Sequence, residues 1–266
     1  MLKNSMEISV LDTRYKRQKP LKPAIKYFKS DGNWLRYAVS GKPEGQLLLF
    51  IHGAPGSWDN FRYYLKDPVL AKTARMVSVD RPGYGKSMPG QMITSLQRQA
   101  ELISPLLAQD SSGKGAIVVG HSYGGPVAAA IAMFYPEKVA GLVMLAPALD
   151  PDNEKLFWFN KPVANSFVNN LLPDMLRVAN NEKMTHAAEL RKLLPHWGKL
   201  QMPVTMLHGE QDRIVPVANI DFARKMITAA PLRLHQLKGA NHLIPWNRAG
   251  LVRKTLLQHL EGQVPR

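Results

Sequence analysis

The chain has 266 residues and no cysteine, which excludes a disulfide framework, a thiolate zinc site and a cysteine nucleophile. Apolar residues make up 45% of the chain, enough for a substantial core, but they form no run of about 18 residues that would span a membrane. The net charge of +15 comes without a zinc-finger spacing, an RNA-recognition aromatic motif or an arginine-rich tract, so we expect no nucleic-acid partner.

The basic residues are concentrated near the N-terminus. Residues 1–36 contain nine of the 35 Lys and Arg residues, against only Glu7, Asp12 and Asp31. Such an excess favours peripheral contact with an anionic membrane surface, although solubility alone is the simpler explanation. Residues 1–24 contain two Lys-Pro pairs and show no hydrophobic period, so they are predicted to form a polar, basic N-terminal arm. They lack the apolar region of a signal peptide. We expect a soluble domain, either cytoplasmic or, if a preceding segment has been removed, associated with the cell envelope.

From residue 25 onward, short strands alternate with helices. The first two strands flank the turn triplet Asp31-Gly32-Asn33 and are expected to form an antiparallel hairpin. The later strands are unbroken apolar runs, which are typical of a parallel sheet covered on both faces. Strands are predicted at 25–28, 34–39, 47–51, 76–79, 116–119, 141–145, 203–207 and 232–237, and helices at 58–72, 94–107, 127–135 and 247–260. This order predicts an α/β fold with a mostly parallel, doubly wound sheet.

The most informative stretch is the Gly-x-Ser-x-Gly sequence centred on Ser122. It follows an apolar strand and precedes an alanine-rich helix that has Pro126 in its first turn, where no hydrogen bond is lost. A serine at the tip of such a tight turn projects its hydroxyl out of the sheet, and bulky side chains are excluded at Gly120 and Gly124. The stretch therefore predicts a nucleophile elbow with Ser122 as the nucleophile.

Further motifs occur in a fixed order around this elbow. They are His-Gly-Ala-Pro at 52–55, Asp-Arg-Pro-Gly at 80–83, and an aspartate and a histidine after the last two strands. Together, over residues 25–263, they resemble the α/β-hydrolase fold family. The resemblance implies a core formed by residues 25–147 and 201–266, with a helical cap inserted at 148–200.

The resemblance implies a catalytic triad of Ser122, Asp212 and His242. Asp212 ends a Gly-x-x-Asp sequence after the seventh strand, and its carboxylate would accept the Nδ1 proton of the histidine. Asp150, at the end of the preceding strand, is the alternative acid, because some family members carry the acid there. Of the eight histidines, only His242 lies on the loop after the last strand, third in the order Ser, Asp, His.

The expected oxyanion hole consists of the backbone N–H groups of Ala54 and Tyr123. The resemblance gives the first donor as Ala54, and Pro55 has no N–H of its own while its fixed φ restrains the preceding amide. The second donor follows the nucleophile at the positive end of a helix. His52 is expected to support the oxyanion loop, and His121 to point away from the nucleophile.

The loop after the fourth strand is expected to be architectural. Asp80 is predicted to cap a turn of this loop with its carboxylate, in preference to a catalytic role, and Arg81 to brace the same loop.

The interval 151–200 breaks the alternation of strands and helices. It contains four prolines and clustered aromatic residues, and in the family this is where the cap is inserted. One or more of Phe157, Trp158 and Phe159 are expected to line the substrate pocket. We recognise no cluster of charged residues in the interval, which favours an apolar acyl or alkyl group as the guest.

Serine at the elbow argues against the family's haloalkane dehalogenases and epoxide hydrolases, which use aspartate there. We therefore expect a serine hydrolase, cleaving a small to medium apolar carboxylic ester through an acyl-enzyme, with no metal or organic cofactor. Carbon–carbon bond hydrolases, thioesterases, amidases and cofactor-free perhydrolases use the same residues, so they stay open as alternatives. A non-catalytic ligand-binding member of the fold is the alternative from a different class. The sequence leaves the oligomeric state open.

Overall fold

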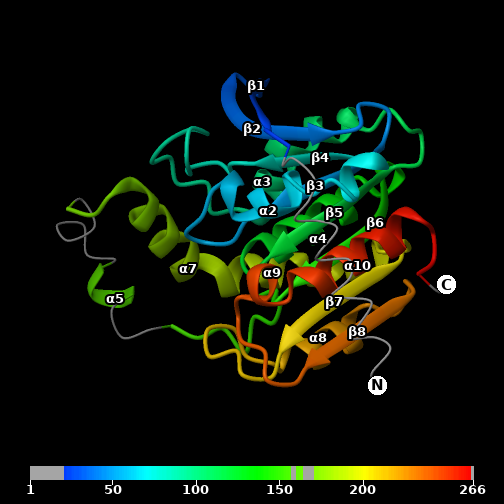
Figure 1. Ribbon diagram of the computed structural model, residues 1–266. Helices are drawn as coiled ribbons and strands as arrows, with labels where there is room; N and C mark the ends of the chain where they lie inside the picture. The colour runs from blue at the N-terminus through cyan, green and yellow to red at the C-terminus, as the bar shows by residue number, and fades with distance from the viewer. Residues whose placement is uncertain (1–20, 157–159, 164–170, 265–266) are drawn as a thin grey trace.

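The computed structural model describes residues 21–156, 160–163 and 171–264 (Figure 1). They form an eight-stranded sheet in the order β1-β2-β4-β3-β5-β6-β7-β8. β1 (Ala24–Ser30) pairs antiparallel with β2 (Asn33–Gly41), and β2 pairs antiparallel with β4 (Ala74–Val79). The remaining pairings are parallel and involve β3 (Gln46–Ile51), β5 (Ala116–His121), β6 (Val139–Leu145), β7 (Val204–Gly209) and β8 (Leu232–Leu237). Because these strands are parallel, the loops after them meet at one edge of the sheet.

Helices cover both faces of the sheet, and each face has its own apolar core (Figure 1). One core includes side chains of α3 (Leu96–Ile103), α4 (Gly124–Phe134) and α8 (Asn219–Met226). The other includes side chains of α2 (Arg62–Leu65) and α10 (Ala249–Leu260). Ten of the 11 residues of α4 are buried, so its small side chains allow close packing on the sheet. The predicted α/β fold with a doubly wound, mostly parallel sheet is confirmed.

Two of the predicted helices are divided into shorter pieces in the structure. The predicted helix 58–72 consists of η1 (Trp58–Phe61), α2 and η2 (Leu70–Lys72). It is interrupted at Asp67, which accepts hydrogen bonds from the N–H groups of Val69 and Leu70 at 2.8 and 3.2 Å. The cause is Pro68, because a proline disfavours helical conformation in the residue before it. The predicted helix 94–107 is likewise divided, into α3 and η3 (Ser104–Gln109). The predicted helix 247–260 is close to α10, which follows the short α9 (Ile244–Asn247), and η4 (Pro136–Lys138) is a further short turn.

The segment between β6 and β7, called the cap below, is helical. Its helices are α5 (Asn160–Val163), α7 (Asp174–Leu193) and η5 (Leu194–Lys199), and no strand occurs among the described residues of this segment. Figure 1 shows α5 and the start of α7 to the left of the sheet. The end of α7 and η5 return to the sheet, where Leu193 and Trp197 are buried in the core. Phe157, Trp158 and Phe159 lie outside the described residues.

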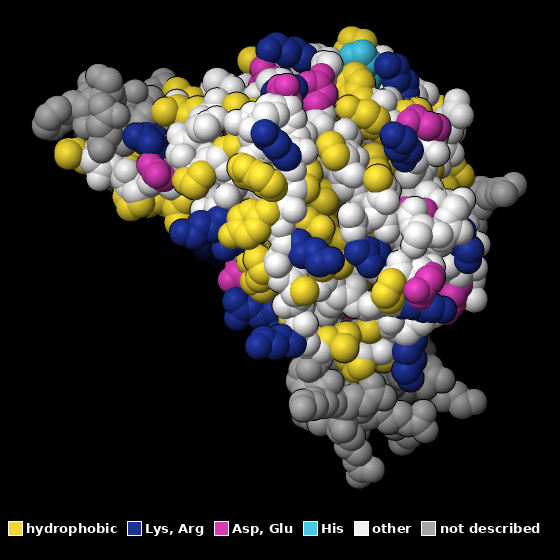
Figure 2. Space-filling view, turned by 90° about the horizontal axis from the view of Figure 1, so that it is seen from above, with side chains coloured by type: hydrophobic (Ala, Val, Ile, Leu, Met, Phe, Trp, Pro, Cys, Tyr) yellow, Lys and Arg dark blue, Asp and Glu magenta, His cyan; other side chains and the backbone are white. Residues whose placement is uncertain are grey.

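One edge of the sheet presents apolar side chains to solvent. Ile25, Tyr27 and Trp34 are 46%, 52% and 58% exposed, and the register of β1 with β2 places them on the same face of the hairpin. Figure 2, seen from the side where β1 and β2 lie, shows hydrophobic side chains interspersed with Lys and Arg. Within the described part of the chain, no helix has the length and apolar character needed to cross a membrane.

Candidate active site

Ser122 occupies a strained turn between β5 and α4. Its φ of 54° lies in the left-handed region, which is unfavourable for a residue with a side chain and is typical of functional turns. The turn is tightly enclosed, since a Cβ added at Gly120 would lie 2.3 Å from the Gly124 carbonyl oxygen. A Cβ at Gly124 would lie equally close, 2.3 Å, to the carbonyl oxygen of Ile51. The two glycines are therefore required for a geometry that presents the serine above the sheet.

His242 and Asp212 lie side by side in the loops after β8 and β7. His242 Nδ1 donates a hydrogen bond to Asp212 Oδ2 at 2.7 Å, while Asp212 Oδ1 accepts from the N–H groups of Ile214 and Val215, each at 2.9 Å. Burial acts to raise the pKa of Asp212, but the hydrogen bond and charge of His242 and these two N–H groups outweigh it and lower the pKa. The carboxylate thus stays ionised and fixes the tautomer of His242 with Nε2 unprotonated.

Asp150, the alternative acid, is engaged elsewhere. Its carboxylate accepts from the backbone N–H of Asp152 at 2.9 Å and from the side chain of Asn153 at 2.7 Å. It therefore closes a local turn, and the structure brings Asp212 rather than Asp150 to His242.

Two further histidines pack around the pair. His121 Nε2 donates to the backbone carbonyl of His242 at 3.1 Å, and its ring centroid lies 4.9 Å from that of His242. Burial, reinforced by the nearby His242, lowers the pKa of His121 to about 3, so that this ring stays neutral. His208 Nε2 lies 3.5 Å from Asp212 Oδ2. The hydrogen bond from His121 thus supports the loop that carries His242.

The residues of the predicted oxyanion donors, Ala54 and Tyr123, line the same cavity as Ser122. A Cβ added at Gly53 would be 3.0 Å from Ser122 Cβ, so the loop after β3 passes directly beside the serine. Among the described residues, neither the Ala54 N–H nor the Tyr123 N–H donates to a backbone carbonyl. Two unpaired donors beside a strained serine are what stabilisation of an oxyanion requires.

The loop after β4 supports this arrangement. Asp80 accepts from the backbone N–H groups of Trp58 at 2.8 Å and Lys86 at 3.0 Å, and it pairs with Arg36 at 2.6 Å, which agrees with an architectural role. The sequence predicts that Arg81 braces its own loop, but its side chain makes other contacts. Its guanidinium reaches the carbonyl groups of the oxyanion loop and a carboxylate of the cap, Glu182.

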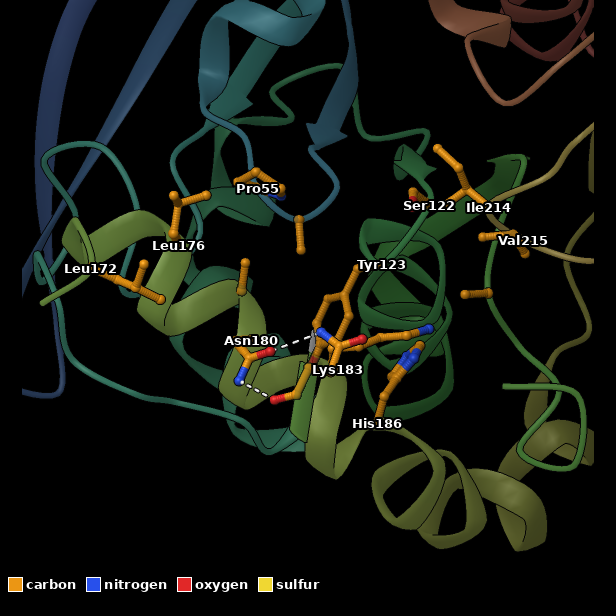
Figure 3. Close-up of a pocket in the computed structure, with 14 residues that line it drawn as sticks. Pro55, Ser122, Tyr123, Leu172, Leu176, Asn180, Lys183, His186, Ile214 and Val215 are labelled. Carbon is orange, nitrogen blue, oxygen red and sulfur yellow. Dashed lines mark hydrogen bonds between the residues drawn. The ribbon is translucent and has the colours of Figure 1, made fainter. Parts of the chain in front are cut away.

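A cavity of about 560 Å³ opens above Ser122 and Tyr123 (Figure 3). Leu172 and Leu176 of the cap line one side of it, and Ile214 and Val215, which follow β7, line the other. Most of the lining surface is apolar. The pocket therefore suits an apolar group.

The expectation that the cap lacks a charged cluster is wrong. Lys183 of α7 pairs with Glu154, and His186 Nδ1 lies 3.2 Å from the same carboxylate. Burial acts to raise the pKa of Glu154, but His186 and Lys183 outweigh it and lower the pKa. Both Lys183 and His186 line the cavity, together with Asn180.

Sequence reasoning missed this cluster because Glu154 lies 29 residues before Lys183. The signal was present in α7, where Leu176, Asn180, Lys183 and His186 recur at intervals of three or four residues and so share one helix face. Among the described residues, no group of three His, Asp or Glu side chains could hold a metal ion.

Comparison with known proteins agrees with this geometry. The sequence model of the alpha/beta hydrolase fold matches residues 46–191, more than half of the chain. The chain belongs to the α/β-hydrolase fold family. Solved structures of the family share its fold: an epoxide hydrolase superposes with a TM-score of 0.73 at 18% identity, covering 91% of this chain and all of that chain.

The relatives that match this chain are named as different enzymes. A dihydrolipoyllysine-residue acetyltransferase component of an acetoin cleaving system from Cupriavidus necator is 28% identical, with 90% of this chain and 70% of that protein aligned. Epoxide hydrolase B of Mycobacterium tuberculosis is 36% identical, but over only 40% of this chain and 31% of its own length. A 2-hydroxy-6-oxononadienedioate/2-hydroxy-6-oxononatrienedioate hydrolase of Pseudomonas is 25% identical, over 81% of this chain and 88% of that protein. The family shown is one of hydrolases, and the relatives do not agree on one substrate.

Proposed function

We propose that this α/β hydrolase is a serine hydrolase that cleaves small to medium apolar carboxylic esters. The observation that carries the proposal is the 2.7 Å hydrogen bond between His242 and Asp212, at the same edge of the sheet as the strained Ser122. Ser122 stands where epoxide hydrolases have aspartate, and a serine forms an acyl ester rather than an alkyl ester.

In the proposed reaction, His242 Nε2 takes the proton of the Ser122 hydroxyl as Oγ bonds to the carbonyl carbon. The negative charge that develops on the carbonyl oxygen is stabilised by the N–H groups of Ala54 and Tyr123. As the bond to the leaving oxygen breaks, the imidazolium returns its proton to form the alcohol. Water then attacks the acyl-enzyme, with His242 again as the base, and releases the acid. Asp212 remains ionised throughout and stabilises the imidazolium.

The apolar cavity supports an alkyl or acyl chain as the guest. Burial of each methylene contributes about 0.8 kcal/mol, and the cavity of about 560 Å³ has room for a short chain beside the reacting carbonyl. Phe157, Trp158 and Phe159 remain proposed contributors to this pocket.

Carbon–carbon bond hydrolysis is a second candidate. It is favoured by the Pseudomonas relative, which aligns over most of both chains, and by the polar wall of Lys183, His186 and Asn180. Such groups suit a substrate with acidic and keto groups better than a simple alkyl ester. Loss of absorbance of a 2-hydroxy-6-oxononadienedioate on incubation with the protein would favour this candidate over ester hydrolysis.

A fluorophosphonate probe and p-nitrophenyl butyrate test the proposal. The wild-type chain should be labelled and should hydrolyse the ester, whereas Ser122→Ala should abolish labelling and lower kcat by several orders of magnitude. Ser111→Ala changes a serine on the surface that donates to the Pro43 carbonyl, and it should leave both readouts unchanged. Absence of labelling in the wild type would instead indicate a ligand-binding member of the fold.

A further inference from the structure

Arg81 is a buried cation beside the oxyanion loop. Its side chain has no exposed surface. Nε donates to the His52 carbonyl at 2.9 Å and Nη2 to the Gly53 carbonyl at 3.1 Å. The Arg81 backbone N–H also donates to His52 Nε2 at 3.0 Å, which leaves His52 Nδ1 protonated to donate to the same Gly53 carbonyl at 2.7 Å. Arg81 and His52 together fix the Gly53 carbonyl.

Fixing this carbonyl orients the first oxyanion donor. The Gly53 carbonyl and the Ala54 N–H belong to one peptide group, which is planar and trans, so its C=O and N–H point in opposite directions. Because the C=O is held on the side of Arg81, the N–H is turned away from Arg81. Arg81 also touches the second donor residue, since its Cζ lies 4.7 Å from the centroid of the Tyr123 ring.

The charge of Arg81 is balanced from the cap. Glu182, on α7, receives two hydrogen bonds from the guanidinium, at 2.6 and 3.0 Å. Tyr84 donates to the same carboxylate at 2.6 Å and Gln99 at 2.8 Å. Within the described part of the chain, Glu182 is the one carboxylate in ion-pair contact with Arg81, and it too is fully buried.

Loss of one partner of a buried ion pair is strongly destabilising, because the remaining charge lies in the protein interior with neither a counter-charge nor solvent. Movement of α7 away from the core would therefore leave Arg81 without its counter-charge, and water or other groups would compete for its guanidinium. The hydrogen bonds that hold the Gly53–Ala54 peptide would then loosen.

We propose that Glu182 is a positioning residue for the oxyanion hole, so that the hole is complete only while the cap helix is docked. This inference rests on the proposed function, because it assigns a role to the Ala54 and Tyr123 N–H groups. When the cap closes over a substrate, the N–H groups of the oxyanion hole would be held in place. When the cap opens for product release, these groups would loosen.

Glu182→Gln tests the proposal, because it keeps the shape of the side chain and removes the charge. We expect kcat for p-nitrophenyl butyrate to fall about 10- to 100-fold with little change in KM, since loss of a single oxyanion donor outright costs about 10²- to 10³-fold. Affinity for an alkyl trifluoromethyl ketone, which forms an oxyanion on Ser122, should fall by a similar factor.

Glu189→Gln is the matched control. Glu189 is also a buried carboxylate of α7, and it accepts from the Leu96 N–H of the core at 3.3 Å without contacting the oxyanion loop. This variant should keep kcat and inhibitor affinity within about twofold of wild type. If Glu182→Gln fails to fold, Tyr84→Phe removes only the hydroxyl that donates to Glu182 and should lower kcat in the same direction by a smaller factor.

Amide hydrogen exchange of residues 52–56 gives a readout that does not depend on turnover. Exchange should be faster in Glu182→Gln than in wild type and unchanged in Glu189→Gln. The inference is overturned if Glu182→Gln changes neither the exchange rate nor kcat, or if it raises KM alone. If Tyr84→Phe has to be used instead, the inference is overturned when that variant keeps the kcat and the inhibitor affinity of the wild type. Failure of the wild type to react with a fluorophosphonate contradicts the proposed function instead, and the exchange experiment still decides whether Glu182 holds the loop.

Discussion

The carboxylate of Asp212 and the imidazole of His242 meet from loops that follow two adjacent parallel strands, with 2.7 Å between Oδ2 and Nδ1. The parallel pairing of β7 with β8 is what brings them together, because both loops leave the sheet at the same edge. Two backbone N–H groups hold the second oxygen of Asp212, so the carboxylate has little freedom to rotate away from the histidine.

Asp212→Asn should lower kcat by about 10⁴-fold. An amide can present its NH₂ group to His242 Nδ1 and thereby stabilise the wrong tautomer, with Nε2 protonated and unable to act as a base. Asp150→Asn is the matched control, and it should leave kcat near the wild-type value because the Asp150 carboxylate hydrogen-bonds within its own turn. Steady-state kinetics with p-nitrophenyl butyrate measure both. A larger loss in Asp150→Asn would make that residue the acid.

Acyl-chain preference should follow the apolar cavity. For p-nitrophenyl esters, kcat/KM should rise up to about fourfold per methylene from acetate to hexanoate, the factor that corresponds to 0.8 kcal/mol, and then level off when the cavity is filled. Ala179→Leu adds volume on the wall formed by α7 and should move the optimum towards acetate.

Ala188→Leu makes the same change at an exposed position of α7 outside the cavity lining, so it should preserve the wild-type preference. Rates that do not depend on chain length, or activity confined to charged esters, would count against an apolar guest. The second of these results would point to Lys183 and His186 as the groups that recognise the substrate.

The fold was predictable because its signals are local. The glycines of the elbow, the turn at Asp31-Gly32-Asn33 and the unbroken apolar strands each depend on neighbouring residues only. The break at Asp67 was also readable from Pro68, but the apolar pattern on either side of it favoured one continuous helix.

The contacts between cap and core were not predictable in this way. Glu182 lies 101 residues after Arg81, in an inserted segment whose position over the sheet is set by tertiary packing. Neither an arginine nor a glutamate indicates its partner by sequence spacing at such a distance. The same holds for Glu154 with Lys183 and His186, where the charged residues of the cap resembled a solvated surface until the fold brought them together.

The exposed edge at β1 and β2 leads to a prediction about an anionic membrane surface. Exposed Lys22 and Lys29 lie close in the chain to Ile25 and Tyr27, and Lys29 pairs with Trp34 across the hairpin. Figure 2 shows hydrophobic side chains among Lys and Arg on this side of the molecule, and such a surface suits the interface of an anionic bilayer. The chain should sediment with phosphatidylglycerol-containing vesicles at low salt and not with phosphatidylcholine vesicles. Trp34→Ser should weaken this binding, whereas Leu171→Ser, at a 71% exposed position of the cap, should not. Equal binding to both kinds of vesicle would be inconsistent with an electrostatic surface.

Stability should fall in mild acid through His259, a buried residue of α10 that hydrogen-bonds with Thr205 at 2.9 Å. Burial, assisted by the charge of Arg233, lowers the pKa of His259 from 6.5 to about 4. Below pH 6.5 the unfolded chain therefore binds a proton that the folded chain excludes, so stability is fully present above pH 6.5 and is lost as the pH falls towards 4. The slope from this residue approaches about 1.4 kcal/mol per pH unit within that window.

Urea unfolding of the wild type and of His259→Gln at pH 7.5, 6, 5 and 4.5 measures this contribution. The variant removes the ionisable group and keeps a polar side chain opposite Thr205, so any change in packing shifts its free energy of unfolding by a similar amount at every pH. The free energy of unfolding of the wild type minus that of the variant should therefore decrease steadily below pH 6.5, because the wild type loses stability faster than the variant. His121, whose pKa is also lowered by burial, acts in the same direction in both proteins and cancels in the comparison. Parallel curves for the two proteins across this range would show that His259 is not kept neutral by the fold.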